Sequence, residues 1–268
     1  MYQQDNFFPI ESAWGNKAIC LSGIGSNKPF QALAVDCLPD LHFIGDSQTF
    51  PIKVWSGGGF VDNITDWALK QFGTHYAGEI GKGKAARPIT KQAIFHYCYA
   101  VLHDPVYREK YAQNLKREFP RIPFYAGFWQ WAAWGEALMA LHIGYEGVTP
   151  FALSRSDEPD AKARAAGLNP KALLRADMAA GSIALDTETT LRGIPPDAWR
   201  YKLGNRSAID WVLDQYKEKK PKDPTIREKF DTYRFADYKD KVLDLLLRVT
   251  TVSVETMKVV DAMRAAAR

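Results

Sequence analysis

One stretch of the sequence, residues 88–125, limits what the chain can fold into more than any other. After Thr90, apolar and aromatic residues recur at helical spacing until Asp104-Pro105 ends the pattern. Proline is tolerated best in the first turn of a helix, and the preceding aspartate can cap that helix. Pro120 and Pro123 then stop the second helix and favour an extended chain. The stretch therefore predicts two helices and an extended exit, a scaffold without a catalytic constellation.

The other helices are predicted from the same spacing. Tyr107, Tyr111 and Leu115 recur every four residues and predict the buried stripe of the second helix. A further apolar helical face runs through residues 128–142. Two separate helical segments are expected within residues 241–263.

Strand patterns flank this helical centre. Short apolar and alternating runs fill residues 17–55, including one at 42–45 and one at 49–55, and a weaker group follows at 148–192. Strands before, helices between and strands after predict an α+β fold. Its expected parts are an N-terminal β-rich part (1–87), a central helical scaffold (88–147) and a second α/β part with C-terminal helices (148–268), together forming one integrated domain.

The composition is that of an ordinary globular protein. The 268 residues can bury a substantial core, and a net charge of +4 is compatible with a polyanionic partner without requiring one. The three cysteines lack metal-ligand spacing, which indicates reduced thiols in a cytoplasmic protein. No secretory signal or membrane-spanning run is present, and the abrupt start suggests a piece of a longer polypeptide.

Residues 78–84 match the glycine–lysine spacing of a phosphate-binding loop. Ala85 stands where serine or threonine would hold magnesium, however, and no apolar strand precedes the loop. These two departures from the motif argue against nucleotide binding. Two interpretations remain open: Lys82, Lys84 and Arg87 contact a nucleic-acid backbone, or they belong to a solvated charged loop.

One pair of acidic residues could hold a metal ion. Asp186 and Glu188 are two residues apart on an expected strand, so both carboxylates would lie on one face. A nuclease centre of the common kind needs a lysine two residues further on, and the chain has threonine there. An exposed acidic strand face is the favoured interpretation.

A structural role is the favoured interpretation of the aromatic and imidazole side chains on the helices. His96, His103 and His142 have no partner at metal-ligand spacing and are expected in the core or at an interface. Tryptophans at 129–134 could stack on bases, but helical aromatics beside leucine and methionine are usually core residues.

Basic and polar loops supply the candidate contacts to DNA. A basic run at 217–222 could hold phosphates without reading sequence, and the loops 26–28 and 46–49 could reach base edges. Alone, these loops are weak indications. The candidate DNA-binding residues are Asn27, Lys28, Gln48, Lys82, Lys84, Arg87, Asn205, Arg206, Lys217, Lys219, Lys220 and Lys222.

Several segments, in a fixed order, resemble one protein family. They are residues 46–51, 62–67, 89–124, 201–211 and 248–260. The family is the C-terminal target-recognition, or specificity, domain of single-chain Type ISP restriction–modification enzymes and related helicase–methyltransferase fusions. The resemblance covers the chain from about residue 17 to residue 260.

The resemblance implies a domain that reads a target in double-stranded DNA. It also implies that a nuclease, an ATP-driven motor and an adenine methyltransferase belong to the rest of the parent polypeptide. S-adenosylmethionine, ATP and magnesium would then serve the full-length enzyme, and no cofactor is expected in this chain. The Asn-Pro-Pro-Tyr motif of such a methyltransferase is absent, since Asn169-Pro170 continues differently. No base-reading residue carries over from the family.

The favoured hypothesis is therefore a sequence-specific DNA-binding module that is non-catalytic by itself. The alternative is an interaction module, which docks on a methyltransferase or helicase-like motor domain of the same polypeptide without reading bases. An enzymatic role based on Asp186 and Glu188, or on the 78–84 loop, is a third alternative.

Overall fold

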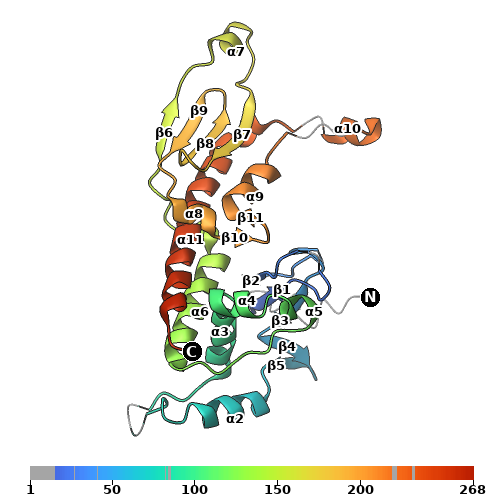
Figure 1. Cartoon of the computed structure of the whole chain (residues 1–268). Helices are drawn as coiled ribbons and strands as arrows, with labels where there is room; N and C mark the ends of the chain where they lie inside the picture. Colours follow the sequence, from blue (N-terminus) through green and yellow to red (C-terminus); the bar gives the residue numbers. More distant parts are fainter. Residues whose placement is uncertain are drawn as a thin grey trace. The chain divides into compact units, whose positions relative to one another are not determined.

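The computed structural model describes residues 16–26, 28–40, 42–81, 83, 86–218, 222–230 and 233–268 (Figure 1). The chain divides into two compact units. The first consists of Met1–Gly144 and Lys258–Arg268, and the second of Tyr145–Met257. Both units mix strands and helices, so the predicted α+β class is confirmed. The finer three-part division expected from the sequence stays a prediction.

A small antiparallel sheet opens the first unit. Its strands are β1 (Ala18–Leu21), β2 (Ala32–Val35) and β3 (Gln48–Pro51), in the order β2-β1-β3. The central strand β1 is buried along its whole length. The strand predicted at 42–45 is wrong, because these residues form turns.

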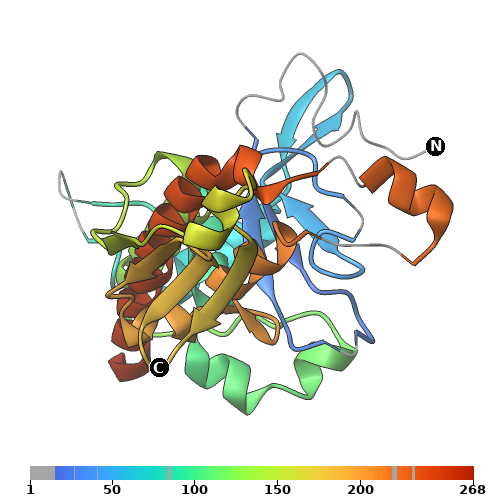
Figure 2. The ribbon, with the colours of Figure 1, turned by 90° about the horizontal axis from the view of Figure 1, so that it is seen from above.

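The strand predicted at 49–55 is in fact divided between two sheets. Its second half is β4 (Lys53–Ser56), which pairs with β5 (Gly59–Asp62) in a separate hairpin (Figure 2, light blue). Gly57 and Gly58 form the turn with φ of 61° and 86°, a conformation that glycine adopts without strain. Periodicity alone cannot reveal such a division, because the alternation continues through it.

Helices complete the first unit. They are α2 (Asp66–His75), α3 (Lys91–Val101), α4 (Pro105–Lys110), α5 (Asn114–Arg117) and α6 (Phe128–Ile143). The predicted caps are confirmed: the side chains of Thr90 and Asp104 accept hydrogen bonds from the first turns of α3 and α4. Residues 118–127 form neither helix nor strand, in keeping with the helix stop that the prolines predicted.

The predicted stripe of the second helix is wrong at its middle position. Helix α4 ends at Tyr111, which is 37% exposed, and the chain starts a new short helix at Asn114. Tyr107 and Leu115 are buried as predicted. The break displaces Tyr111 from the buried face, so truncating it should affect stability much less than truncating Leu115.

The core of the first unit forms where α3 and α6 pack closely together. Gly135 permits this contact, because a Cβ atom at that position would lie 1.7 Å from the carbonyl oxygen of His96. Tyr97 and Phe128 stack in the same core, with ring centroids 5.3 Å apart. The face predicted for residues 128–142 is buried as expected.

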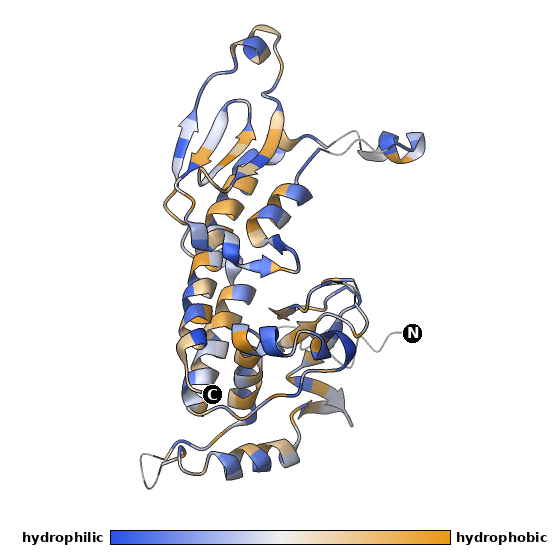
Figure 3. Cartoon of the chain, viewed as in Figure 1, coloured by the Kyte–Doolittle hydropathy of each residue, from blue (hydrophilic) through white to orange (hydrophobic). Residues whose placement is uncertain are grey.

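The second unit is built on a four-stranded antiparallel sheet. Its strands are β6 (Ser154–Asp157), β7 (Ala172–Asp177), β8 (Ser182–Asp186) and β9 (Thr189–Arg192), in the order β6-β9-β8-β7. Ile183, Leu185 and Leu191 are fully buried on one face. Hydrophobic residues are prominent on β7 and β8 (Figure 3). Strand β7 forms one edge of the sheet.

Shorter elements accompany this sheet. They are the 3₁₀ helices η2 (Tyr145–Gly147) and η3 (Phe235–Tyr238), the strands β10 (Lys202–Leu203) and β11 (Arg206–Ser207), and the helices α7 (Ala161–Ala165), α8 (Pro196–Arg200), α9 (Ala208–Gln215) and α10 (Pro224–Phe230). Ser207 caps α9, and Asp210 completes a capping box with it.

The two C-terminal helical segments predicted from the sequence are in fact one helix, α11 (Lys239–Ala265). Threonine and serine at the expected break do not interrupt it, because their hydroxyl groups donate to carbonyls one turn earlier. Thr250 bonds the oxygen of Leu246 and Ser253 that of Val249, each at 2.7 Å. Across the described part of the chain, no helix combines the length and the apolar character that crossing a membrane requires.

Candidate nucleic-acid interface

The two polar loops predicted to reach DNA lie against each other in the first unit. The amide of Gly23 donates to the carbonyl oxygen of Gly45 at 3.5 Å, and a Cβ atom on Gly23 would lie 2.2 Å from the carbonyl oxygen of Asp46. The side chain of Lys28 extends over Gly45, with its Nζ 3.3 Å from the position of a Cβ atom there. Two loops that are separate in sequence therefore form one surface, here called the loop pair (residues 23–28 and 42–48).

The loop pair presents polar side chains to solvent. Lys28 is exposed, and so is Gln48, the first residue of β3, whose backbone is fixed by pairing with Leu21. Asp46 has a positive φ of 48° and turns the chain into β3. Asn27, the third candidate of these loops, lies outside the described residues.

The loop that matches a phosphate-binding frame has a different role. Glu79 accepts hydrogen bonds from the amides of Gly127 and Phe128, at 3.0 and 2.7 Å. The N-terminus of α6 thus already holds a carboxylate of this chain, which favourably meets the positive end of the helix dipole. The preceding element is helix α2 and not a strand. Of the candidates in this loop, Lys82 and Lys84 lie outside the described residues.

Arg87, at the end of that loop, is exposed and stacks on an aromatic ring. Its guanidinium carbon lies 3.6 Å from the centroid of the Trp129 ring. The cation–π contact holds the guanidinium in place, while no described residue pairs with its charge. Trp129 is half-buried and Trp131 is fully buried, so the tryptophans are core residues, as favoured from the sequence.

In the second unit, two candidate cations share one carboxylate. Asp214 pairs with Arg206 at 3.1 Å and with Lys217 at 3.8 Å. The guanidinium of Arg206 also lies 5.3 Å from the ring centroid of Trp211. Asn205 is exposed in the β10–β11 turn.

The basic run at 217–222 is described only in part. Lys217 and Lys222 are exposed, and helix α10 follows at Pro224. Lys219 and Lys220 lie outside the described residues.

The predicted exposed acidic face at Asp186 and Glu188 is wrong, and the two carboxylates have different ion-pair partners. Asp186 is buried, forms an ion pair with Lys239 at 2.7 Å and accepts the amides of Glu188 and Thr189 in the β8–β9 turn. Among the described residues there is no group of three or more histidine, cysteine or acidic side chains that could hold a metal ion.

Glu188 instead anchors the polar insert between β6 and β7. Its carboxylate accepts the amide of Asp160 at 2.8 Å and pairs with Arg164 at 2.9 Å, and the hydrogen bond with Arg164 is the largest cause of its lowered pKa. Asp160 caps α7 and accepts the hydroxyl of Thr187 at 2.6 Å. The insert is exposed, but these contacts hold it against the β8–β9 turn.

All three helix histidines are buried, as the sequence favoured, and His103 and His142 are hydrogen-bonded. His142 Nδ1 lies 2.6 Å from the hydroxyl of Tyr99, and His103 Nδ1 lies 2.8 Å from the carbonyl oxygen of the same residue. Because a carbonyl only accepts, His103 Nδ1 carries the proton. These two histidines belong to the core of the first unit.

A family model described as the Type ISP C-terminal specificity domain matches residues 1–245. The chain belongs to this family. No curated protein matches the chain. Among solved structures, this specificity domain is similar to a chain of the "DrdV-DNA complex", with 52% identity and a TM-score of 0.88; the match covers 100% of the domain and 26% of that chain.

Two further structures carry the same fold. A nuclease-deletion mutant of the Type ISP restriction–modification enzyme LlaGI, in complex with a DNA substrate mimic, is 26% identical with a TM-score of 0.71, over 97% of the specificity domain and 22% of that chain. The ATP-dependent Type ISP enzyme LlaBIII bound to DNA is 23% identical with a TM-score of 0.73. That match covers 100% of the specificity domain and 17% of the LlaBIII chain. The domain thus spans about a quarter or less of each of these chains.

Proposed function

We propose that this specificity domain recognises a base sequence in double-stranded DNA as one part of a larger restriction–modification enzyme. The observation that carries the proposal is the match of the whole chain, at about half identity, to part of a protein in complex with DNA. The exposed cations and amides described above are of the types that DNA recognition uses.

The candidate residues divide by what they can reach. Gln48, on the loop pair, has a side chain that can form hydrogen bonds with base edges, and the charge of Lys28 on the same surface suits a phosphate. Arg87, Arg206 and Lys217 are held in place by neighbouring side chains and suit phosphate contacts. The remaining candidates are Asn27, Lys82, Lys84, Asn205, Lys219, Lys220 and Lys222.

The domain does no chemistry of its own in this proposal. A nuclease, a motor and an adenine methyltransferase in the rest of the parent polypeptide would use magnesium, ATP and S-adenosylmethionine. The whole enzyme would act on DNA in the cytoplasm. The domain would contribute the choice of site.

A DNA titration at several salt concentrations tests the proposal. The chain should bind a mixed-sequence duplex, and log K should fall linearly with log salt by about 0.9 for each phosphate contacted. The single strand of the same sequence, for which the slope is about 0.7 per phosphate, is the comparison. Absent binding, or binding that ignores salt, would contradict the proposal.

Lys28 and Gln48 should differ in what they contribute. Lys28→Ala should weaken binding to all duplexes alike and lower the salt slope by about one. Gln48→Ala should keep the slope but lose about 1–3 kcal/mol of preference at one base pair, measured by selection from a random duplex pool. Gln130→Ala, at an exposed glutamine of α6, is the matched control. A slope change for Gln48→Ala would mean that this residue does not read a base.

One observation favours the docking alternative. Trp67, on α2, is 72% exposed, and Val61 on the neighbouring β5 is 46% exposed. Exposed apolar residues of this size are typical of interaction sites. Docking on a methyltransferase or motor domain of the same polypeptide is the function that would remain if the chain showed no binding to DNA.

A further inference from the structure

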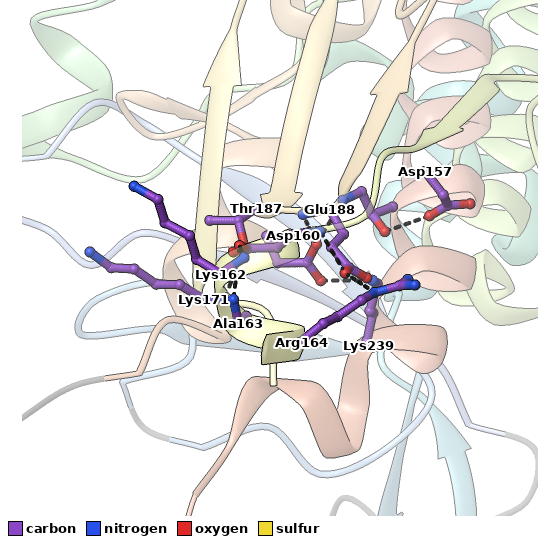
Figure 4. A network of polar contacts seen from close by, with 11 residues as sticks. Asp157, Asp160, Lys162, Ala163, Arg164, Lys171, Thr187, Glu188 and Lys239 are labelled. Atoms are coloured by element: carbon purple, nitrogen blue, oxygen red, sulfur yellow. Dashed lines mark hydrogen bonds and ion pairs between the residues drawn. The ribbon is translucent and has the colours of Figure 1, made fainter. Parts of the chain in front are cut away.

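The second unit carries cations that the sequence did not indicate. Lys171 immediately precedes β7, and its amide donates to the hydroxyl of Thr187 at 3.2 Å. Lys162 lies in α7, whose cap Asp160 bonds the same hydroxyl. The side chains of Lys162 and Lys171 extend to the same side, away from the carboxylates (Figure 4). Neither ammonium group has an ion-pair or hydrogen-bond partner in the described part of the chain.

Arg175 lies further along the edge strand β7. The pairing of β7 with β8 shifts between Ala172 and Arg175, and the buried Leu174 in the shift has a positive φ of 45°. Such a bulge re-aims the side chains that follow it. Arg175 pairs with Ala184 and not with the buried Ile183, so it lies on the face opposite the core. It is exposed and has no partner among the described residues.

A depression beside β7 brings Arg175 together with two of the predicted cations. It has a volume of about 440 Å³ and lies between β7 and α9, with Arg175, Arg206 and Lys217 in its lining. Both carboxylates in its lining already have partners. Asp214 pairs with Arg206 and Lys217, and Asp210 accepts a hydrogen bond from the hydroxyl of Ser207 in the capping box. The guanidinium of Arg175 therefore remains as an uncompensated positive charge.

Edge strands often carry lysine simply to prevent pairing with another sheet. The cations here extend beyond the strand, however, from α7 at one end to α9 at the other. The bulge takes up one residue, so Lys171 and Arg175 are roughly 10 Å apart along the strand, at about 3.3 Å for each residue of the partner strand. An edge of that length suits a polymer with many phosphates better than a single anion, because each strand of duplex DNA carries a phosphate every 3.4 Å or so of helix axis.

We propose that this row, the β7 edge (Lys162, Lys171, Arg175, Arg206 and Lys217), contacts the phosphate backbone of the DNA that the domain recognises. The inference rests on the proposed function and adds to it a surface and three residues that the sequence did not indicate. Contacts to phosphate carry no sequence information, so the β7 edge sets affinity and position, and base reading lies elsewhere.

The test compares the double variant Lys171→Gln with Arg175→Gln against the unaltered chain. Binding to a mixed-sequence duplex is measured by fluorescence anisotropy over a range of salt concentrations. The double variant should bind on the order of tenfold more weakly at low salt, and its log–log salt slope should be smaller by about two. Lys241→Gln, at an exposed lysine of α11 in the same unit, is the matched control and should leave both values unchanged.

The outcomes separate this inference from the function on which it rests. If the unaltered chain binds and the double variant shows the same affinity and slope, the β7 edge is only a protected sheet edge and the inference is overturned. If the unaltered chain does not bind DNA, the proposed function fails, and the inference fails with it. Thermal melting checks that the double variant is folded, and the single variant Arg175→Gln, expected to lower the slope by about one, gives an independent reading.

Discussion

Replacing Asp104 by alanine should destabilise the protein by about 3–5 kcal/mol. The side chain is fully buried, and its carboxylate is engaged on every side. It accepts the amides of Val106 and Tyr107 at the start of α4 and the hydroxyl of Tyr125. The guanidinium of Arg268 donates to both oxygens, from Nη2 to Oδ1 at 2.6 Å and from Nε to Oδ2 at 3.0 Å. Removing the carboxylate leaves the guanidinium without a counter-charge and the start of α4 without its cap, and this accounts for the size of the effect.

Chemical denaturation of three variants checks this result. Asp66→Ala is the matched control, since Asp66 also lies in the first turn of a helix and pairs with a lysine, Lys91, at 2.6 Å, but its side chain is 91% exposed. It should lose only a small fraction of what Asp104→Ala loses. Asp104→Asn keeps the shape and part of the cap and should fall between them. Equal losses at Asp104 and Asp66 would show that burial is not the cause.

Acid should unfold the protein chiefly because of two of its buried histidines, His103 and His142. Burial lowers the pKa of His142 from its ordinary value to about 3 and the pKa of His103 well below its ordinary value, and the nearby charge of Arg108 adds to both shifts. In the unfolded chain both would titrate near pH 6.5. Above that pH the two states bind equal numbers of protons. Below it only the unfolded state takes them up, so stability falls progressively as the pH drops from about 6.5 towards 3.

His142 alone should lower the free energy of unfolding by about 2 kcal/mol between about pH 7.5 and pH 5, and His103 should lower it further. The measurement is the free energy of unfolding at each pH. His142→Gln, which keeps a hydrogen-bonding partner for Tyr99 but does not titrate, should remove the share of the acid sensitivity that comes from His142. An unchanged profile for His142→Gln would assign the acid sensitivity to other groups.

The sequence predicted those features that depend on neighbours in the chain. The caps at Thr90 and Asp104 each require only a side chain and the backbone two or three residues later, and both are present. Family membership was recognised for the same reason, since ordered local segments carried it. The single helix α11 was mispredicted because Thr250 and Ser253 satisfy their own hydroxyl groups within the helix.

Features that depend on distant pairings could not be predicted in this way. The loop pair exists because β1 lies between β2 and β3 and brings the two connecting loops to the same place. Arg175 escaped notice because its exposure follows from the bulge in β7 and from the position of β7 at the sheet edge. Asp186 was misjudged because its partner, Lys239, is far away in the sequence.

The contacts that anchor the polar insert also determine how freely it can vary. They are concentrated at its two ends: Asp160 accepts the hydroxyl of Thr187 and Arg164 pairs with Glu188 near the first end, and the amide of Lys171 donates to Thr187 at the second. Residues 165–170, between these two ends, take part in none of these contacts. Each doubling of the length of a loop destabilises the fold by only about 0.6 kcal/mol, through the entropy of closing the loop. Relatives with different targets could therefore lengthen, shorten or exchange the tip of the insert while the sheet beneath it keeps its fold.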